Sequence, residues 1–300
     1  MASTADISKY LSTKLLSSVN NLEFLARQIV EGFITGLHKS PFHGFSAEFS
    51  QHKPYMQGDN IRYIDWKVFA RSDRYYIKQF EEETNLRCSI LLDISKSMTY
   101  SSQSITKLHY ASVLTACLAY LMLKQRDATG LMLFDDQIRQ SLPIKSIPVY
   151  IREIIQSLDN IQPGSDTNIT NALHSIADKI KRRGLIIIIS DLLDDPEAVL
   201  SGIKHLQYNK HEIIVFQVVD DKEIDFDFKG EFVFEDLETH QKIKTDSRYV
   251  RQEYINQFKH HCDYYKTRLH ENYIEYNILR TSQPIELALA QYLIRRQNLY

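Results

Sequence analysis

The sequence is poor in glycine, with 9 glycines in 300 residues, whereas an average chain has about 7%. It contains no G-x-G-x-x-G, no G-x-x-x-x-G-K-[ST] and no G-x-S-x-G. A nucleotide-binding loop needs glycines so that backbone amides can approach phosphate groups. These absences argue against a dinucleotide enzyme of the usual kind, a P-loop NTPase and a G-x-S-x-G hydrolase.

The chain also has few cysteines and almost no net charge. The cysteines Cys88, Cys117 and Cys262 are far apart, and neither C-x-x-C nor H-E-x-x-H occurs. This pattern fits buried thiols in a reducing compartment better than a disulfide framework or a zinc site. The net charge of −2 provides no electrostatic footprint for nucleic acid, so none is expected as a partner.

No targeting or membrane segment is evident. Met1 to Tyr10 lacks a basic start followed by an apolar core, so no signal peptide is expected. The longest mostly apolar stretch, Ala111 to Leu123, is shorter than the ~20 residues that a membrane span requires. The sequence therefore predicts a soluble, cytoplasmic protein with no membrane span.

The composition is that of a globular protein, at 43% hydrophobic and 25% charged residues. Apolar residues recur at helical spacing from Ile7 to Leu37, which predicts a helical arm over residues 1–40. His43 to Arg87 is dense in aromatic and charged residues, and Tyr75 to Phe80 alternates as a strand does. We predict a small β-rich subdomain over residues 41–87.

From Cys88 onward, apolar runs alternate with helical patterns. Ala128 to Phe134, Leu185 to Ile189 and Ile213 to Val219 are expected to be strands, and Gln103 to Arg126 a helix. This alternation predicts an α/β domain over residues 88–300 with a doubly wound, mostly parallel sheet. A β-hairpin insertion is expected at about residues 220–246.

Oxygen-bearing side chains follow the predicted strands. Asp93, Ser95 and Ser97 end the first strand of this domain, Thr167 follows a glycine loop, and Asp191 ends the Leu185 strand. Sites in an open parallel sheet form outside the carboxyl ends of the strands. Carboxylates and hydroxyls are hard oxygen donors, which suit Mg²⁺. We therefore predict a Mg²⁺ (or Mn²⁺) site.

The chemistry of these donors leaves three interpretations open. Neutral hydroxyls would leave the ion much of its charge, so that it attracts a carboxylate from another molecule, which favours adhesion over catalysis. Asp93 could instead be the nucleophile of a Mg²⁺-dependent phosphohydrolase, although the second acid expected two positions later is Ser95. The third interpretation is a scaffold with an unused site, because Ser and Asp also cap helices and fill turns.

The segment from Cys88 to Tyr300 resembles a von Willebrand factor A domain. By that resemblance, the D-x-S-x-S run at Asp93 is the first motif of a metal-ion-dependent adhesion site, Thr167 is the second and Asp191 the third. The resemblance implies a von Willebrand factor A-like fold and a metal-dependent protein-binding role.

A second resemblance rests on segments spread over most of the chain. They are Ser40-Pro41 to Glu48-Phe49, Tyr55-x-x-Gly58-Asp59-x-Ile61-Arg62-x-Ile64-Asp65-Trp66, Ala70-Arg71, Phe80-Glu81-Glu82-Glu83, Phe234-Glu235-Asp236-Leu237-Glu238-Thr239 and Thr281-x-x-Pro284. These segments resemble the bacterial domain-of-unknown-function 58 family. That resemblance implies an adaptor or partner of a MoxR-type AAA+ ATPase and its client in chaperone-like assembly.

The sequence thus predicts a non-enzymatic, metal-dependent protein-binding module, with no catalytic residues and no organic cofactor. The cluster of Arg62, Asp65 and Trp66 has two interpretations, a partner surface or an internal anchor between the two domains. Packing is favoured, because a buried Trp supplies contact area and usually finds a hydrogen-bond partner.

Overall fold

The core of the protein is a six-stranded sheet with the strand order β10-β7-β6-β3-β4-β5. The computed structural model describes residues 21–38, 53–54, 69, 74–77, 86–164, 169–228, 230–235 and 241–297. All neighbouring strands of this sheet are parallel except β5, which runs antiparallel to β4 at one edge. The strands are β3 (Arg87–Asp93), β4 (Ala128–Phe134), β5 (Ile138–Lys145), β6 (Leu185–Ser190), β7 (Glu212–Val219) and β10 (Glu275–Arg280).

The sheet is doubly wound, as predicted. The chain starts in the middle at β3, proceeds outward through β4 and β5, and then returns to the other side of β3 to form β6, β7 and β10. The direction of winding therefore reverses between β3 and β6. The carboxyl ends of these two strands lie side by side, which is where ligand sites form in open α/β sheets.

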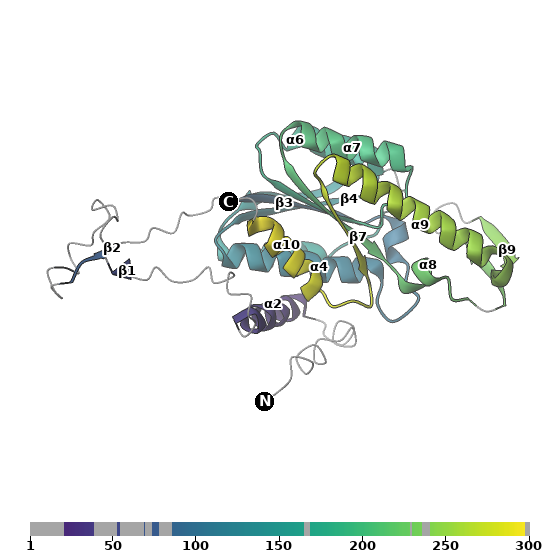
Figure 1. The fold of residues 1–300 in the computed structure, drawn as a ribbon, viewed down its shortest axis with the longest axis horizontal. Coiled ribbons are helices and arrows are strands. Elements are labelled where there is room, and N and C mark those ends of the chain that lie inside the picture. The colour runs from purple at the N-terminus through teal and green to yellow at the C-terminus, as the bar shows by residue number, and fades with distance from the viewer. Residues whose placement is uncertain are drawn as a thin grey trace, which may run out of the picture.

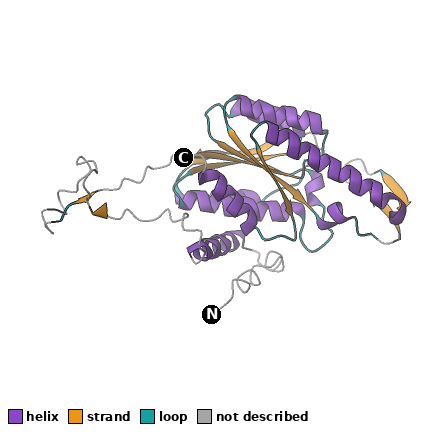
Figure 2. Cartoon of the chain, in the orientation of Figure 1, coloured by secondary structure: helices purple, strands orange, loops and turns teal. Residues whose placement is uncertain are grey.

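Helices cover both faces of the sheet (Figures 1 and 2). The helices α2, α4, α5 and α10 share one hydrophobic cluster on the first face, and α6, α7 and α9 share another on the second face. Their bounds are α2 (Leu22–His38), α4 (Lys107–Lys124), α5 (Ile151–Asp159), α6 (Ile169–Lys179), α7 (Pro196–Tyr208), α9 (Ser247–Glu271) and α10 (Glu286–Gln297). None of the described helices is long and apolar enough to cross a bilayer.

The β-branched run of β6 explains its central place. All residues of this strand are buried, and alternate side chains point to opposite faces. Ile187 and Ile189 join the cluster under α4, whereas Ile186 and Ile188 join the cluster under α6 and α7. Each such burial contributes roughly 1.5–3 kcal/mol, so a strand with isoleucines on both sides favours the middle of a covered sheet.

The N-terminal helical arm is present as α2, which packs on α4. Leu25, Ile29 and Val30 of α2 are buried in the same cluster as the sheet residues under α4. This contact explains why α4 is buried on nearly all sides, as expected for a helix that is apolar all round. The rest of the predicted arm, residues 1–20, lies outside the described residues.

The β-rich block is described in part. The short strands β1 (Lys53–Pro54) and β2 (Tyr76–Ile77) form an antiparallel pair. The remainder of the predicted Tyr75 to Phe80 strand and the cluster of Arg62, Asp65 and Trp66 lie outside the described residues. The domain boundaries at residues 40 and 87 stay predictions.

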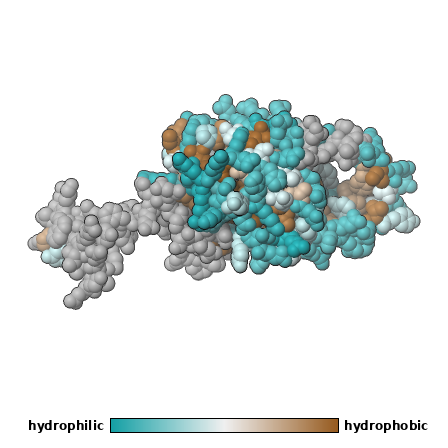
Figure 3. Space-filling model, turned by 90° about the horizontal axis from the view of Figure 1, so that it is seen from above, coloured by the Kyte–Doolittle hydropathy of each residue, from teal (hydrophilic) through white to brown (hydrophobic). Residues whose placement is uncertain are grey.

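The segment after β7 contains the expected hairpin. The strands β8 (Glu231–Glu235) and β9 (Lys242–Asp246) pair antiparallel. The rings of Phe226, Phe228, Phe234 of β8 and Tyr254 of α9 contact one another here. Hydrophobic side chains gather at this end of the molecule (Figure 3). A short helix, α8 (Asp221–Asp225), precedes the hairpin and has no counterpart in the prediction.

One predicted boundary is wrong. The helix expected from Gln103 begins four residues later, at Lys107. Thr106 is extended, and its side chain accepts a hydrogen bond from the backbone N–H of His109 at 3.0 Å. The helix therefore begins after this capping threonine, and the residues before it form a loop. A hydrogen bond from the backbone N–H of Ser102 to Asp220, at 2.9 Å, connects this loop to the residue that follows β7.

Candidate functional site

Each of the four central parallel strands leads into a buried aspartate. Asp93 is the last residue of β3, and Asp135, Asp191 and Asp220 directly follow β4, β6 and β7. All four residues are 0% exposed. Parallel strands end at a common edge, so the topology gathers these carboxylates at one end of the sheet. A buried carboxylate needs hydrogen bonds or a cation, and the four differ in which they receive.

Asp93 receives only neutral partners. Its Oδ1 accepts a hydrogen bond from the backbone N–H of Ser95 at 2.8 Å, and its Oδ2 accepts one from the Ser190 hydroxyl at 2.6 Å. The Ser95 and Ser97 hydroxyl oxygens lie 3.0 Å apart. The turn that follows β3 therefore presents two hydroxyls beside the Asp93 carboxylate, as the D-x-S-x-S spacing predicts.

The environment of Asp93 opposes its negative charge. Burial, and secondarily the negative charge of Asp191, raise the pKa of the Asp93 carboxyl from 3.8 to about 7. Hydrogen bonds from Ser190 and Ser95 only partly offset this rise. Two buried carboxylates that repel each other, next to two hydroxyls, form an arrangement that a bound divalent cation would stabilise.

Asp191 is paired with a lysine that the sequence analysis missed. Its Oδ2 accepts a hydrogen bond from the Lys107 ammonium at 2.8 Å, and its Oδ1 accepts one from the backbone N–H of Leu193 at 3.2 Å. Gln217 of β7 donates to the Asp191 backbone carbonyl at 2.8 Å. Lys107, in the first turn of α4, is itself 0% exposed, so the pair is a fully buried ion pair.

Lys107 has a second carboxylate partner, Glu223 of α8. The Lys107 Nζ lies 2.6 Å from the Glu223 Oε1. Burial opposes the charge on Lys107, but the two carboxylates outweigh it and hold the lysine pKa above its ordinary value. Burial raises the pKa of Glu223 despite the neighbouring ammonium. The three side chains form one closed unit that joins α4, the end of β6 and α8.

Asp220 and Asp135 are also satisfied from within the chain. Asp220 caps α8, accepting from the backbone N–H groups of Lys222 and Ser102, each at 2.9 Å. Asp135 accepts from Arg139 at 2.8 and 2.6 Å through its two oxygens. Among the described residues of this edge, Asp93 is thus the aspartate left without a cation or a capped helix.

Gly164 lies close to the ends of β3 and β4. Its backbone N–H donates to the Ile94 carbonyl at 2.9 Å, and a Cβ atom built on it would lie 2.0 Å from Asp135 Oδ2. Only glycine lets this loop pass so close to the end of β4. Thr167, the remaining predicted ligand, lies outside the described residues, as do all of residues 165–168.

The predicted donor set fits a hard divalent cation in part. Asp93, Ser95 and Ser97 come together, and Asp191 is close enough to Asp93 to affect its pKa. Among the described side chains, no group of three or more His, Cys, Asp and Glu gathers as a metal cluster. An ion at this site would therefore depend on hydroxyls and on retained water, as Mg²⁺ tolerates.

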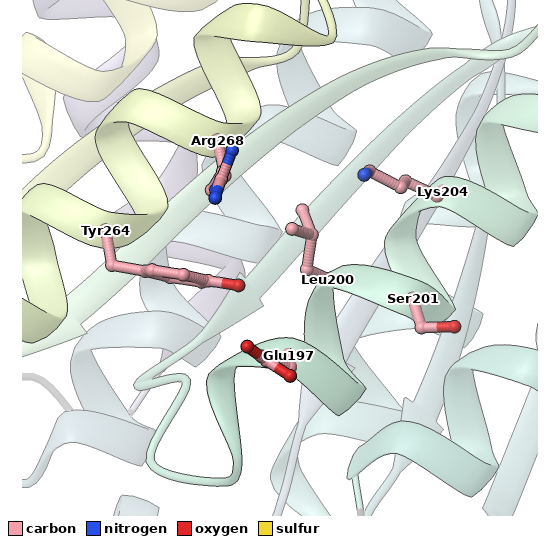
Figure 4. A pocket seen from close by; sticks show the side chains of 6 residues that line it. All are labelled: Glu197, Leu200, Ser201, Lys204, Tyr264 and Arg268. Atoms are coloured by element: carbon pink, nitrogen blue, oxygen red, sulfur yellow. The ribbon is translucent and has the colours of Figure 1, made fainter.

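A separate hollow lies between α7 and α9 on the outside of the fold (Figure 4). Its lining residues are Glu197, Leu200, Ser201, Lys204, Tyr264 and Arg268. Arg268 stacks over the Tyr264 ring and pairs with Glu271 at 3.1 Å. None of the strand-end aspartates lines this hollow, so it plays no part in the candidate site.

A sequence profile for the family described as "Protein of unknown function DUF58" matches residues 51–264. The chain belongs to this family. The match begins within the aromatic and charged block and covers most of the sheet domain. The DUF58 chain is also similar to an uncharacterized protein of Mycobacterium tuberculosis (Rv1480) and to one of Mycobacterium bovis (Mb1516). Each is 21% identical over 229 residues, which cover 75% of this chain and 72% of the relative.

Solved structures with partial similarity to this DUF58 chain include two bacterial proteins and a VWA domain. The conserved hypothetical protein BatB from Bacteroides thetaiotaomicron is 17% identical, with a TM-score of 0.45 over 71% of this chain and 99% of that one. An aerotolerance-related membrane protein from Bacteroides fragilis is 18% identical, with a TM-score of 0.46 over 69% and 97%. The SpRpn10 VWA domain is 13% identical, with a TM-score of 0.41 over 69% and 95%.

Proposed function

We propose that this DUF58 protein is a non-enzymatic protein-binding module. In this proposal its strand-end pocket holds a Mg²⁺ or Mn²⁺ ion and binds a carboxylate of a protein partner. The observation that carries the proposal is the state of Asp93, a fully buried carboxylate with no cationic partner among the described residues, beside two hydroxyls 3.0 Å apart. A buried charge in this state is costly, and a divalent cation would offset the cost.

The ion would be held by Asp93, Ser95 and Ser97, with Thr167 and Asp191 as the further predicted ligands. Ser190 orients Asp93 through its 2.6 Å hydrogen bond, and the Ser95 N–H fixes the other oxygen. When bound, the ion would supply a positive position that an anionic side chain can occupy. Because the hydroxyls are neutral, the chain leaves the ion positive charge for that contact.

The geometry favours binding over catalysis. A nucleophilic aspartate must reach the phosphorus of its substrate, but Asp93 is 0% exposed and both of its oxygens accept hydrogen bonds. The residue two positions later is Ser95, so no second acid is placed there as general acid or base. These points support the non-enzymatic proposal over the Mg²⁺-dependent phosphohydrolase.

The proposed partner is a MoxR-type AAA+ ATPase together with its client. This part of the proposal rests on the family membership and on the partnership that the family resemblance implies. A cytoplasmic location is proposed with it, because Cys88, Cys117 and Cys262 are all free and buried, as suits a reducing compartment.

The test is capture of a MoxR-type ATPase of the same host on the immobilised full chain, with Mg²⁺ and with EDTA. We expect capture by the wild type in Mg²⁺, and at least about tenfold less in EDTA or with Asp93→Ala, since even the loss of an outer-shell partner of a metal ligand typically costs about that much. The matched control Asp159→Ala removes an exposed aspartate at the end of α5 and is expected to bind as the wild type does. Equal capture by all samples would contradict the proposal.

A second arm tests the alternative function. The wild type is assayed with p-nitrophenyl phosphate in Mg²⁺, and no turnover above buffer is expected. Turnover by the wild type that disappears in Asp93→Asn would establish the phosphohydrolase and overturn the non-enzymatic proposal.

A further inference from the structure

Lys107 is the most unusual charged residue of the described chain. Lysine is almost never fully buried unless it is paired, and Lys107 is 0% exposed in the first turn of a mostly apolar helix. Its ammonium contacts two carboxylates, Asp191 at 2.8 Å and Glu223 at 2.6 Å. One of these, Asp191, is also a predicted metal ligand.

The same carboxylate therefore has two competing cations. Lys107 occupies the Asp191 Oδ2, and the Leu193 N–H occupies the Oδ1. A divalent ion that uses Asp191 must share an oxygen with the ammonium or displace it. Either course brings two positive charges together inside the protein, where charges are screened less than in water.

The short helix α8 keeps the ammonium in place. Asp220 and Glu223 form a capping box, in which the Glu223 Oε2 accepts from the Asp220 backbone N–H at 2.8 Å. Asp220 also accepts from the Ser102 N–H in the loop before α4. Glu223 is thus held through its Oε2, and its Oε1 contacts the Lys107 ammonium.

We propose that Lys107 is an internal cation that competes with the divalent ion for Asp191 and lowers the metal affinity of the pocket. This proposal rests on the metal site of the proposed function and adds the residue that sets its strength. The ion would be held mainly by Asp93 and the two serine hydroxyls, while Asp191 stays with Lys107. Glu223 acts as a positioning residue, through Lys107.

The decisive variant is the double substitution K107M/E223Q. It removes one positive and one negative charge, so the pocket keeps the formal charge of the wild type, and only the competition for Asp191 is lost. The substitutions also avoid leaving Glu223 buried and unpaired, which would destabilise Lys107→Met alone. Glu223→Gln alone serves as the control that keeps Lys107 on Asp191.

The experiment is a Mn²⁺ titration of the full chain, followed by electron paramagnetic resonance of the free ion, with circular dichroism to confirm folding. We expect K107M/E223Q to bind Mn²⁺ at least about tenfold more tightly than the wild type, an effect that corresponds to about 1.4 kcal/mol. Glu223→Gln is expected to bind no more tightly than the wild type. As a second readout, Mn²⁺ should raise the midpoint of thermal unfolding of K107M/E223Q more than that of the wild type.

The outcomes separate this proposal from the proposed function. If the wild type binds Mn²⁺ and the double variant binds equally or more weakly, the competition is disproved and the metal-dependent function stands. If only the double variant binds, the competition is confirmed and the wild type does not work through a metal. If neither binds, both proposals fail.

Discussion

Asp93 and Asp191 lie at the ends of neighbouring strands, are equally buried, and differ in how their charge is balanced. Asp191 lies against the Lys107 ammonium at 2.8 Å, whereas Asp93 has only a hydroxyl and a backbone amide. The same contrast holds across the sheet edge, where Asp135 has Arg139 and Asp220 caps α8. The comparison shows that similar residues at similar strand ends have their charges balanced by different partners.

In the proposed function, this difference separates structural aspartates from the one available to a ligand. A carboxylate with its own cation stabilises the fold as long as the pair stays intact. A buried carboxylate without a cation is costly in its charged form, and binding of an external cation would offset that cost. This contrast makes four predictions, which begin with the largest expected effect.

Removing the internal cation should cost the most stability. In EDTA, Lys107→Met leaves Asp191 and Glu223 buried without their shared ammonium, and we expect a loss of about 3–5 kcal/mol in the free energy of unfolding. Urea denaturation measures it. The control Lys124→Met, an exposed lysine at the end of the same helix, should change the value by less than about 1 kcal/mol. Equal stability of the two variants would show that the buried pair contributes nothing.

Neutralising each aspartate in turn should give unequal effects. Asp191→Asn deprives Lys107 of one of its two carboxylates, and we expect a loss of about 2 kcal/mol or more in EDTA. Asp93→Asn keeps an oxygen that can accept from the Ser95 N–H and removes an opposed charge, so we expect a change of about 1 kcal/mol or less. Urea denaturation at pH 8 measures both, and the reverse order would refute the assignment of roles.

The charge on Asp93 should make the stability of the metal-free protein depend on pH. The folded pKa of about 7 lies above the ordinary 3.8, so the folded state binds the Asp93 proton more tightly than the unfolded state. The stabilisation that comes from this bound proton is therefore complete below the ordinary pKa of 3.8 and is lost as the pH rises through about 7.

The wild type in EDTA should thus lose stability relative to Asp93→Asn between pH 5 and pH 8. We expect a relative loss of the order of 2 kcal/mol, measured by urea denaturation of both proteins at each pH. Subtracting the free energy of unfolding of Asp93→Asn from that of the wild type at each pH cancels the contributions of the other titrating groups. A difference that does not change with pH would mean that Asp93 is not the opposed carboxylate.

The smallest effect on stability is expected at the hydroxyls. Ser97→Ala should lower the free energy of unfolding by about 0.5–1 kcal/mol but weaken Mn²⁺ binding about tenfold, as loss of a ligand does. Ser175→Ala, which removes an exposed hydroxyl from α6, should leave Mn²⁺ binding unchanged. Titration calorimetry measures the Mn²⁺ affinity of both variants, and equal affinities would exclude Ser97 as a ligand.

Local patterns explain which parts of the site could be predicted from the sequence. The isoleucine run of β6 requires burial on both faces, which places Asp191 at the middle of the sheet edge. The D-x-S-x-S spacing places Ser95 and Ser97 beside Asp93 in a turn. Both signals lie within a few residues, and the structure confirms both of these local arrangements.

The charged triad of Lys107, Asp191 and Glu223 could not be predicted in the same way. Lys107 and Glu223 are 116 residues apart in the chain, and a lysine at a helix end ordinarily faces solvent. Because the helix was expected to begin at Gln103, the sequence did not place Lys107 in its first turn, where the structure has it. A lysine followed by a helix that is apolar all round was the available signal, because such a helix leaves no exposed face for the charge.

The most direct test of the account is a crystal structure of the full chain with Mn²⁺, with the ion located by its anomalous scattering. The account predicts an anomalous peak within coordination distance of the Asp93 carboxylate and the Ser95 and Ser97 hydroxyls, with the Lys107 ammonium still on Asp191. A well-ordered Asp93 site with no peak, or a peak elsewhere on the molecule, would contradict it.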